Sequence, residues 1–269
     1  GKVEVDGCIR RGISEEVASD IYAQMENFAS YAFNKSHAAA YAVVSYQTAW
    51  LKCKYPRQFM AALLTSVLDN GTKVSEYIEE CARLSIEVLP PHVNESETGF
   101  TVTGGNIRFG LLAVRNLGRG FITGLLAERK RGGAFSSYYD FCKRLHGKDM
   151  NRRTLESLIK CGALDGLGCN RRQMLQMLPV VLDGLDAAQK KNLEGQLGFF
   201  DNTGLTDSGP DIPDVPEFPP SELLAMEKET AGMYLSGHPM AAYTQQAKQL
   251  RCARIGDIVQ EHEEYQRYH

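Results

Sequence analysis

Apolar positions in the first 85 residues recur with the period of an α-helix, and this pattern predicts four helices. The expected ranges are 12–33, 36–54, 56–71 and 73–85. The second is apolar on nearly all sides, so we expect it to be buried on most of them. In the fourth, one apolar face is formed by Val74, Tyr77, Ile78 and Cys81.

The pattern then changes from helical period to alternation. Two short alternating stretches flank Gly104-Gly105, which predicts a small β-element or hairpin. Helical period returns over 111–195, with glycines in the turns. A Pro/Gly/Asp-rich stretch, 201–220, predicts an extended, mobile linker. A terminal amphipathic helix follows, expected to end at 237–239, so the predicted fold class is mainly α.

The turn "NLGRG", residues 116–120, joins two apolar helical stretches. Gly118 and Gly120 allow close backbone approach and leave N–H groups open at a helix start, where a phosphate can bind. Arg115 and Arg119 add positive charge beside the turn, as does Arg129. This spacing is typical of a helix-hairpin-helix, which contacts the DNA backbone without distinguishing bases.

A second, looser copy covers "TLESLIKCGALDGLGCNRRQMLQML", residues 154–178. Gly162 lies in its turn, and Arg171 and Arg172 begin the helix that follows. The alternative is that both pairs are ordinary helical hairpins whose glycines only end helices. Two copies in one basic segment favour binding to duplex DNA.

Charge supports a polyanion-binding face. Residues 105–172 contain 14 Lys and Arg against 5 Asp and Glu, although the whole chain has a net charge of −3. The alternative is a solvated surface with no ligand.

Cysteine and histidine usage predicts no metal site in this chain. The seven cysteines have no CxxC spacing and the six histidines are dispersed, so we expect free thiols in a reducing compartment. No apolar run is long enough to span a bilayer. The first residues carry neither Met nor a signal-peptide pattern, so we expect a piece of a longer cytoplasmic protein.

A third candidate site is the triplet Lys35-Ser36-His37 at the start of the second predicted helix. With Ser36 as N-cap, the open amides, the Lys35 ammonium and the His37 ring form an anion site suited to a polyphosphate. The alternative is an ordinary cap with Lys35 in solvent and His37 packed at an edge.

A short peptide with paired aromatics, "QLGFF", precedes the predicted linker. An exposed segment of this kind suits docking into an apolar pocket of a partner protein. The alternative is that both aromatic rings fold back onto the hairpin helices. The docking residues would be Gln196, Leu197, Phe199 and Phe200.

Four long stretches, in this order, closely resemble the alpha-subunit family of bacterial DNA polymerase III, the C-family replicative polymerases. They are "FNKSHAAAYAVVSYQTAWLKCKYPRQFMAALL", "IRFGLLAVRNLGRG", "NRRTLESLIKCGALDGLG" and "EKETAGMYLSGHP". The resemblance implies a distal fingers segment at 1–90 and a clamp-binding (little finger) domain with tandem helix-hairpin-helix at 91–200. A linker at 201–221, a connecting helix at 222–250 and the start of a truncated OB domain at 251–269 would follow.

The resemblance also implies roles in template-directed DNA synthesis. The triplet at 35–37 would bind the phosphates of an incoming dNTP, the hairpins would hold primer–template DNA, and "QLGFF" would dock on the sliding clamp (beta subunit). Other holoenzyme subunits are further expected partners. The palm acids that hold Mg²⁺ are absent, so residues outside this chain would bind it and the chain alone should be inactive. Two alternatives are a stand-alone hairpin adaptor that binds DNA and an error-prone polymerase paralogue.

Overall fold

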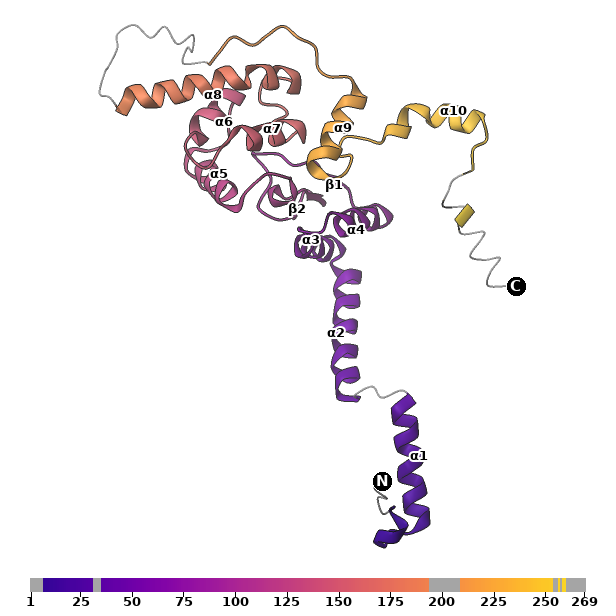
Figure 1. Ribbon diagram of the computed structural model, residues 1–269. Coiled ribbons are helices and arrows are strands. Elements are labelled where there is room, and N and C mark those ends of the chain that lie inside the picture. The colour runs from indigo at the N-terminus through magenta and orange to yellow at the C-terminus, as the bar shows by residue number, and fades with distance from the viewer. Residues whose placement is uncertain (1–6, 31–34, 194–208, 254–255, 257, 260–269) are drawn as a thin grey trace, which may run out of the picture. The chain divides into compact units, whose positions relative to one another are not determined.

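The structure is a computed structural model that describes residues 7–30, 35–193, 209–253, 256, 258 and 259 (Figure 1). Within these residues the chain forms ten α-helices and one small three-stranded sheet. The predicted fold class, mainly α with a small β-element and helical hairpins, is confirmed.

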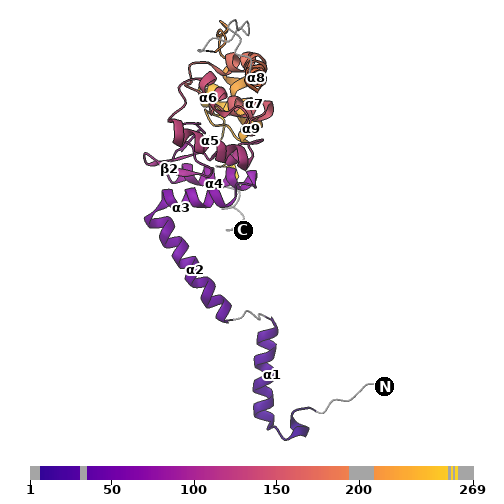
Figure 2. The same cartoon turned by 90° about the vertical axis from the view of Figure 1, so that its left-hand side faces the viewer.

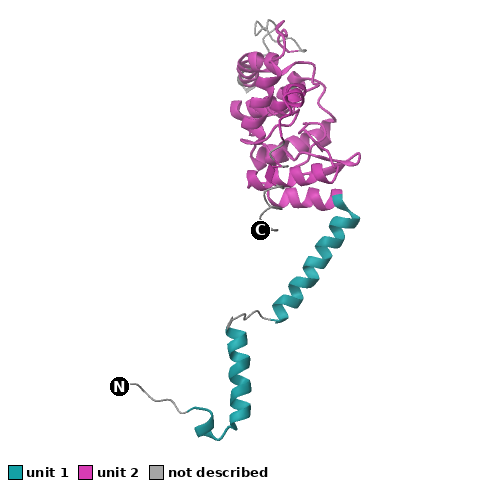
Figure 3. Ribbon diagram, turned by 90° about the vertical axis from the view of Figure 1, so that its right-hand side faces the viewer, with its two compact units in different colours: residues 1–56 teal, residues 57–269 magenta. Residues whose placement is uncertain are grey.

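The chain divides into two compact units, residues 1–56 and 57–269 (Figure 3). The first holds a short 3-10 helix, η1 (Ile9–Arg11), and two helices, α1 (Glu15–Ser30) and α2 (Lys35–Lys54). No residue of α2 is buried, so the expectation that this apolar helix is buried on most sides was wrong. The physical reason is that this unit contains too little chain around α2 to cover it.

The second unit begins with two helices packed against the sheet. α3 (Pro56–Ser66) and α4 (Gly71–Arg83) lie at one end of this unit, and α6 to α8 lie at the other (Figures 1 and 2). Val74 and Cys81 are buried on α4, as the helical spacing predicted. Residues 57–90 thus share a unit with the hairpin helices, and the domain boundary predicted at residue 90 stays a prediction.

The sheet has the order β1-β3-β2, from β1 (Val88–Leu89), β2 (Thr101–Thr103) and β3 (Asn106–Arg108). β2 and β3 pair antiparallel, whereas β1 and β3 pair parallel. The β2–β3 turn is Gly104-Gly105, with φ of 57° and 87°. Two consecutive positive φ values suit glycine in a tight hairpin, so the hairpin prediction is confirmed.

The hairpin helices follow and share one apolar core with the sheet. They are η2 (Leu111–Ala113), α5 (Arg119–Gly132), α6 (Tyr138–Leu145), α7 (Arg152–Lys160) and α8 (Arg171–Leu193). The largest fully buried side chains include Phe109, Phe121, Tyr138, Phe141 and Leu155. Burial of these rings and leucines fixes the two hairpin turns on one body.

The C-terminal part of the second unit lies against the hairpins. α9 (Pro220–Ala231) packs on α7, and η3 (Pro239–Tyr243) and α10 (Thr244–Gln249) follow. α9 ends at Ala231 because Gly232 takes the left-handed conformation, earlier than predicted. The part of the predicted linker at 210–219 is extended as expected, but a backbone amide and a side chain at the start of α8 donate hydrogen bonds to it, so it is held rather than mobile.

Candidate nucleic-acid interface

The first hairpin turn is held by the core and by α7. Leu117 is buried, and Asn116, in the left-handed region with φ 63°, contacts α7 at two points. Its side-chain amide donates to Ser157 Oγ at 3.0 Å, and its carbonyl accepts from Thr154 Oγ1 at 3.2 Å. These contacts position the exposed residues that follow, 118–120.

The start of α5 is open to solvent. Gly118 is the N-cap, in extended conformation, and no side chain caps the helix. Its carbonyl accepts the first helical bond from Ile122, but the amides of residues 119–121 have no acceptor among the described residues. Gly118, Arg119 and Gly120 are exposed. Open amides at the positive end of a helix dipole are suited to binding an anion.

One carboxylate lies close to this helix start. A side chain at Gly120 would place its Cβ 2.8 Å from Asp149 Oδ2, so the Asp149 carboxylate lies beside the first turn of α5. Asp149 is exposed and has φ 56°. Its charge opposes the approach of a phosphate, and the sequence pattern gave no indication of it.

Ion pairs occupy many cations of the basic segment 105–172. Those paired with a carboxylate in the described residues are Arg108, Arg129, Arg131, Arg144, Lys148, Arg152, Lys160 and Arg171. Those with no carboxylate partner in the same residues are Arg115, Arg119, Lys130, Lys143, Arg153 and Arg172. The cations available to a ligand are therefore those of the second group, which includes Arg119 beside the open amides.

Glu128 pairs with three of these cations at once. Its side chain is 1% exposed, and its carboxylate accepts from Arg131, Arg144 and Lys148. Hydrogen bonds from Lys148 and then Arg131 lower its pKa to about 2, against the effect of burial, which raises it. This cluster is structural, because its hydrogen bonds join α5 to α6 and to the turn at Lys148.

Arg171 and Gly162 lie inside the structure. The Arg171 side chain is 7% exposed; it donates to Asp165 Oδ2 at 2.7 Å and to Glu227 Oε1 at 3.1 Å. Burial alone would lower the pKa of Arg171, but the two carboxylates outweigh it and raise that pKa. Gly162, with φ 79°, is buried where a Cβ would lie 2.3 Å from Arg171 Nη2. Neither residue can reach DNA in this structure, so both are left out of the surface proposed below.

The other two predicted arginines lie beside the C-terminal segment. Arg115 bonds α9 through its backbone N–H, to Thr230 O at 2.9 Å, and through its guanidinium, to Glu229 O at 3.0 Å. Arg172 lies over the Phe218 ring, 5.4 Å from its centroid. Neither contact involves a carboxylate, so no ion pair offsets either charge in the described residues.

The triplet at 35–37 belongs to the first unit. α2 begins at Lys35, so Ser36 lies within the first helical turn instead of capping it. All three residues are exposed, and the His37 ring is 4.3 Å from the Tyr41 ring, centroid to centroid. The docking residues predicted at 196–200 lie outside the described residues.

The described residues contain no group of three or more His, Cys, Asp or Glu side chains that could hold a metal ion. All seven cysteines are free, and burial raises the pKa of Cys142 and of Cys161 to about 12. In the part of the chain that the structure describes, no helix has both the length and the apolar character needed to cross a membrane.

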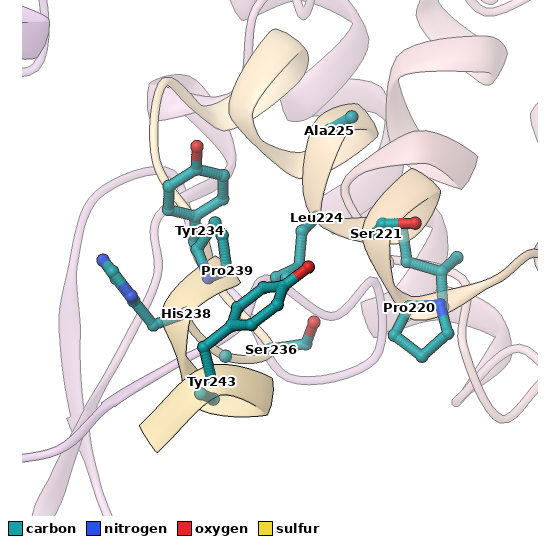
Figure 4. A pocket seen from close by; sticks show the side chains of 12 residues that line it. Pro220, Ser221, Leu224, Ala225, Tyr234, Ser236, His238, Pro239 and Tyr243 are labelled. Carbon is teal, nitrogen blue, oxygen red and sulfur yellow. The ribbon is translucent and has the colours of Figure 1, made fainter. Parts of the chain in front are cut away.

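A separate pocket of about 540 Å³ opens between α9 and η3 (Figure 4). Leu224, Tyr234, His238 and Tyr243 line it, and no predicted site residue does. The sequence pattern gave no sign of this pocket, because its walls come from α9, η3 and the turn between them.

Comparison with known proteins agrees with the hairpin geometry. The helix-hairpin-helix motif family matches residues 85–174. The DNA polymerase III subunit alpha of Neisseria meningitidis serogroup B is 42% identical over 255 residues, which cover 94% of this chain and 22% of the relative. The same subunit of Deinococcus radiodurans is 40% identical over 257 residues, 94% of this chain and 19% of the relative.

The chain thus spans about a fifth of the length of the curated relatives it matches. The DNA polymerase III subunit alpha of Xylella fastidiosa strain Temecula1 is 41% identical over 248 residues, which cover 91% of this chain and 21% of the relative. The resemblance inferred from the four sequence stretches is confirmed.

Proposed function

The chain is similar to DNA polymerase III alpha subunits over nearly its whole length, and from this premise we propose that it supplies duplex binding to such a polymerase. The observation that supports this proposal is the start of α5, where the amides of residues 119–121 have no acceptor and Arg119 has no carboxylate partner in the described residues. Amides and guanidinium groups that bind phosphate read no bases. The proposed binding is therefore independent of DNA sequence.

A second group of donors supports the same surface. The turn at Asn116 is bonded to α7, whose N-cap Asn151 accepts from Thr154 N at 3.0 Å. This leaves the amides of Arg152 and Arg153 open, and the Arg153 guanidinium has no carboxylate partner in the described part of the chain. Two neighbouring helix starts with arginines can contact successive phosphates of one strand.

The remaining roles in DNA synthesis are proposed from the resemblance. Lys35, Ser36 and His37 bind the dNTP phosphates, and Gln196, Leu197, Phe199 and Phe200 dock on the sliding clamp. Primer–template DNA and other holoenzyme subunits complete the partners, and Mg²⁺ is held by residues outside this chain. The polymerase is cytoplasmic.

Similarity over 255 residues, far beyond the hairpin region 85–174, favours this proposal over a stand-alone hairpin adaptor.

Replacing Gly118 tests the proposal with little risk to the fold. Its φ of −79° suits alanine, and an added Cβ meets no atom within 4 Å. In the 269-residue chain, Gly118→Ala should weaken binding to a fluorescent duplex about tenfold, because the methyl group keeps a phosphate from the open amides. Gly71→Ala is the matched control: this glycine starts α4, and its Cβ also meets nothing within 4 Å.

The affinity of the unchanged chain should also fall steeply with salt. The logarithm of the binding constant should decrease with the logarithm of salt concentration by about 0.9 per phosphate contact. Equal affinities of the Gly118 and Gly71 variants, or an affinity insensitive to salt, would contradict the proposed surface.

A further inference from the structure

The start of α8, in the second hairpin, differs from the start of α5 because the chain itself occupies its amides. Asn170 and Gln173 form a reciprocal cap: Gln173 N donates to Asn170 Oδ1 at 2.8 Å, and Asn170 N donates to Gln173 Oε1 at 2.9 Å. Met174 N donates to the Asn170 carbonyl at 3.0 Å. Two of the four N–H groups that a helix start leaves open are satisfied in this way.

A carboxylate from the segment before α9 takes the other two. Glu217 accepts from Arg171 N at 2.8 Å and from Arg172 N at 3.2 Å. A phosphate bound at a helix start would accept from these same amides. No amide of this helix start remains for DNA while Glu217 is bound.

A second carboxylate, ten residues later and on α9 itself, accepts from the Arg171 guanidinium. Glu227, on α9, is 0% exposed and pairs with Arg171 Nη1 at 3.1 Å. Its other oxygen accepts from Leu235 N at 2.8 Å and Ser236 N at 2.9 Å. Glu227 therefore joins the second hairpin to the turn that follows α9.

Two side chains at the start of α8 also bind the extended chain before Glu217. Gln173 Nε2 donates to Pro213 O at 2.9 Å, and Asn170 Nδ2 donates to Val215 O at 3.0 Å. Residues 213–236 are here called the clasp. Its bonds to the start of α8 involve Pro213, Val215, Glu217 and Glu227, and Glu227 in turn holds Leu235 and Ser236.

We propose that the clasp replaces DNA at the start of α8: its two carboxylates take the places of phosphates there, and the starts of α5 and α7 alone bind the duplex backbone. This inference rests on the proposed DNA binding and narrows it to the starts of α5 and α7. The start of α8 then has a different task, which is to fix α9 and the chain after it on the hairpin domain. The predicted ligand Arg171 is in this view a positioning residue.

A pair of charge-matched variants tests the clasp. Glu217→Gln removes the carboxylate at the start of α8, whereas Asp214→Asn removes the same charge from an exposed residue that has no partner in the described part of the chain. Hydrogen exchange in the 269-residue chain should speed up severalfold at the Arg171 and Arg172 amides in the Glu217 variant only. Duplex affinity and its salt slope should be equal in the two variants.

The outcomes separate the two proposals. The inference is overturned if the Glu217 variant binds the duplex more tightly than the Asp214 variant does, with a salt dependence of affinity steeper by about 0.9. That result would mean that Glu217 covers a phosphate site at the start of α8. Equal exchange in both variants would overturn the clasp itself. If the unchanged chain binds no duplex, the proposed function and the assignment of DNA to the starts of α5 and α7 both fail, and hydrogen exchange still decides whether the clasp exists.

Discussion

Replacing Arg171 by methionine should destabilise the second unit strongly, although the sequence pattern assigns this residue to a DNA surface. The substitution keeps most of the apolar stem and removes the guanidinium. Glu227, 0% exposed, would then keep only the amides of Leu235 and Ser236 as donors for a buried charge. Breaking one partner of a buried pair in this way costs about 3–5 kcal/mol.

Urea unfolding followed by circular dichroism measures this loss. A cost of that size lowers the Tm of a unit of this length by roughly 6–20 °C. Arg153→Met is the control for stability, because Arg153 is exposed and has no carboxylate partner in the described residues; it should change unfolding by less than about 0.5 kcal/mol. The double variant Arg171→Met/Glu227→Met should recover much of the loss, since an apolar pair leaves no unpaired charge.

An unfolding free energy of Arg171→Met within about 1 kcal/mol of that of the unchanged chain would contradict the buried ion pair, because breaking such a pair costs more. Should the same variant lose duplex affinity at unchanged stability, Arg171 is a DNA ligand and the clasp does not hold it.

Three further predictions concern other parts of the chain. Lys148, Arg131 and Arg144 lower the pKa of Glu128 from 4.5 to about 2, so the Glu128 carboxylate stabilises the fold above pH 4.5. The difference in unfolding free energy between the unchanged chain and Glu128→Gln should therefore shrink as the pH falls from about 4.5 to about 2. A difference that stays constant over this range would contradict the cluster. Asp149→Asn should strengthen duplex binding more than Asp214→Asn does, because Asp149 lies beside the open amides of α5; equal gains would mean that DNA does not approach there. The combined variant Gln196→Ala/Phe199→Ala/Phe200→Ala should abolish binding to a sliding clamp in a pull-down at unchanged urea midpoint, and retained binding would remove the docking proposal.

Local sequence predicted the elements well because their causes are local. The spacing of Val74 and Cys81 predicted the buried face of α4, and Gly104-Gly105 predicted the β2–β3 turn. The burial of α2 was predicted wrongly because burial depends on what else is near. Apolar residues on all sides of α2 indicate that it can be covered, but residues 1–56 contain only one other α-helix in the described residues.

The site was harder to predict than the fold because its decisive contacts are distant in sequence. Glu217 and Glu227 lie 46 and 56 residues after Arg171, and nothing in "PEFPP" or "AMEKE" marks them as partners of a hairpin. The pairing of many cations in the basic segment could not be predicted from a charge count either. A count of 14 Lys and Arg records the charges but not which of them carboxylates already neutralise.

The two hairpins show why a motif predicts geometry but not availability. Both present a helix start preceded by glycines, and both are fixed by buried leucines. They differ in what the later chain does: α9 contacts the first hairpin at Arg115, before the turn, and leaves residues 118–120 exposed. At the second hairpin the chain just before α9 reaches the helix start itself, through Glu217. A carboxylate and a phosphate compete for the same donors, so a helix start binds DNA only where no acidic side chain of the protein reaches it first.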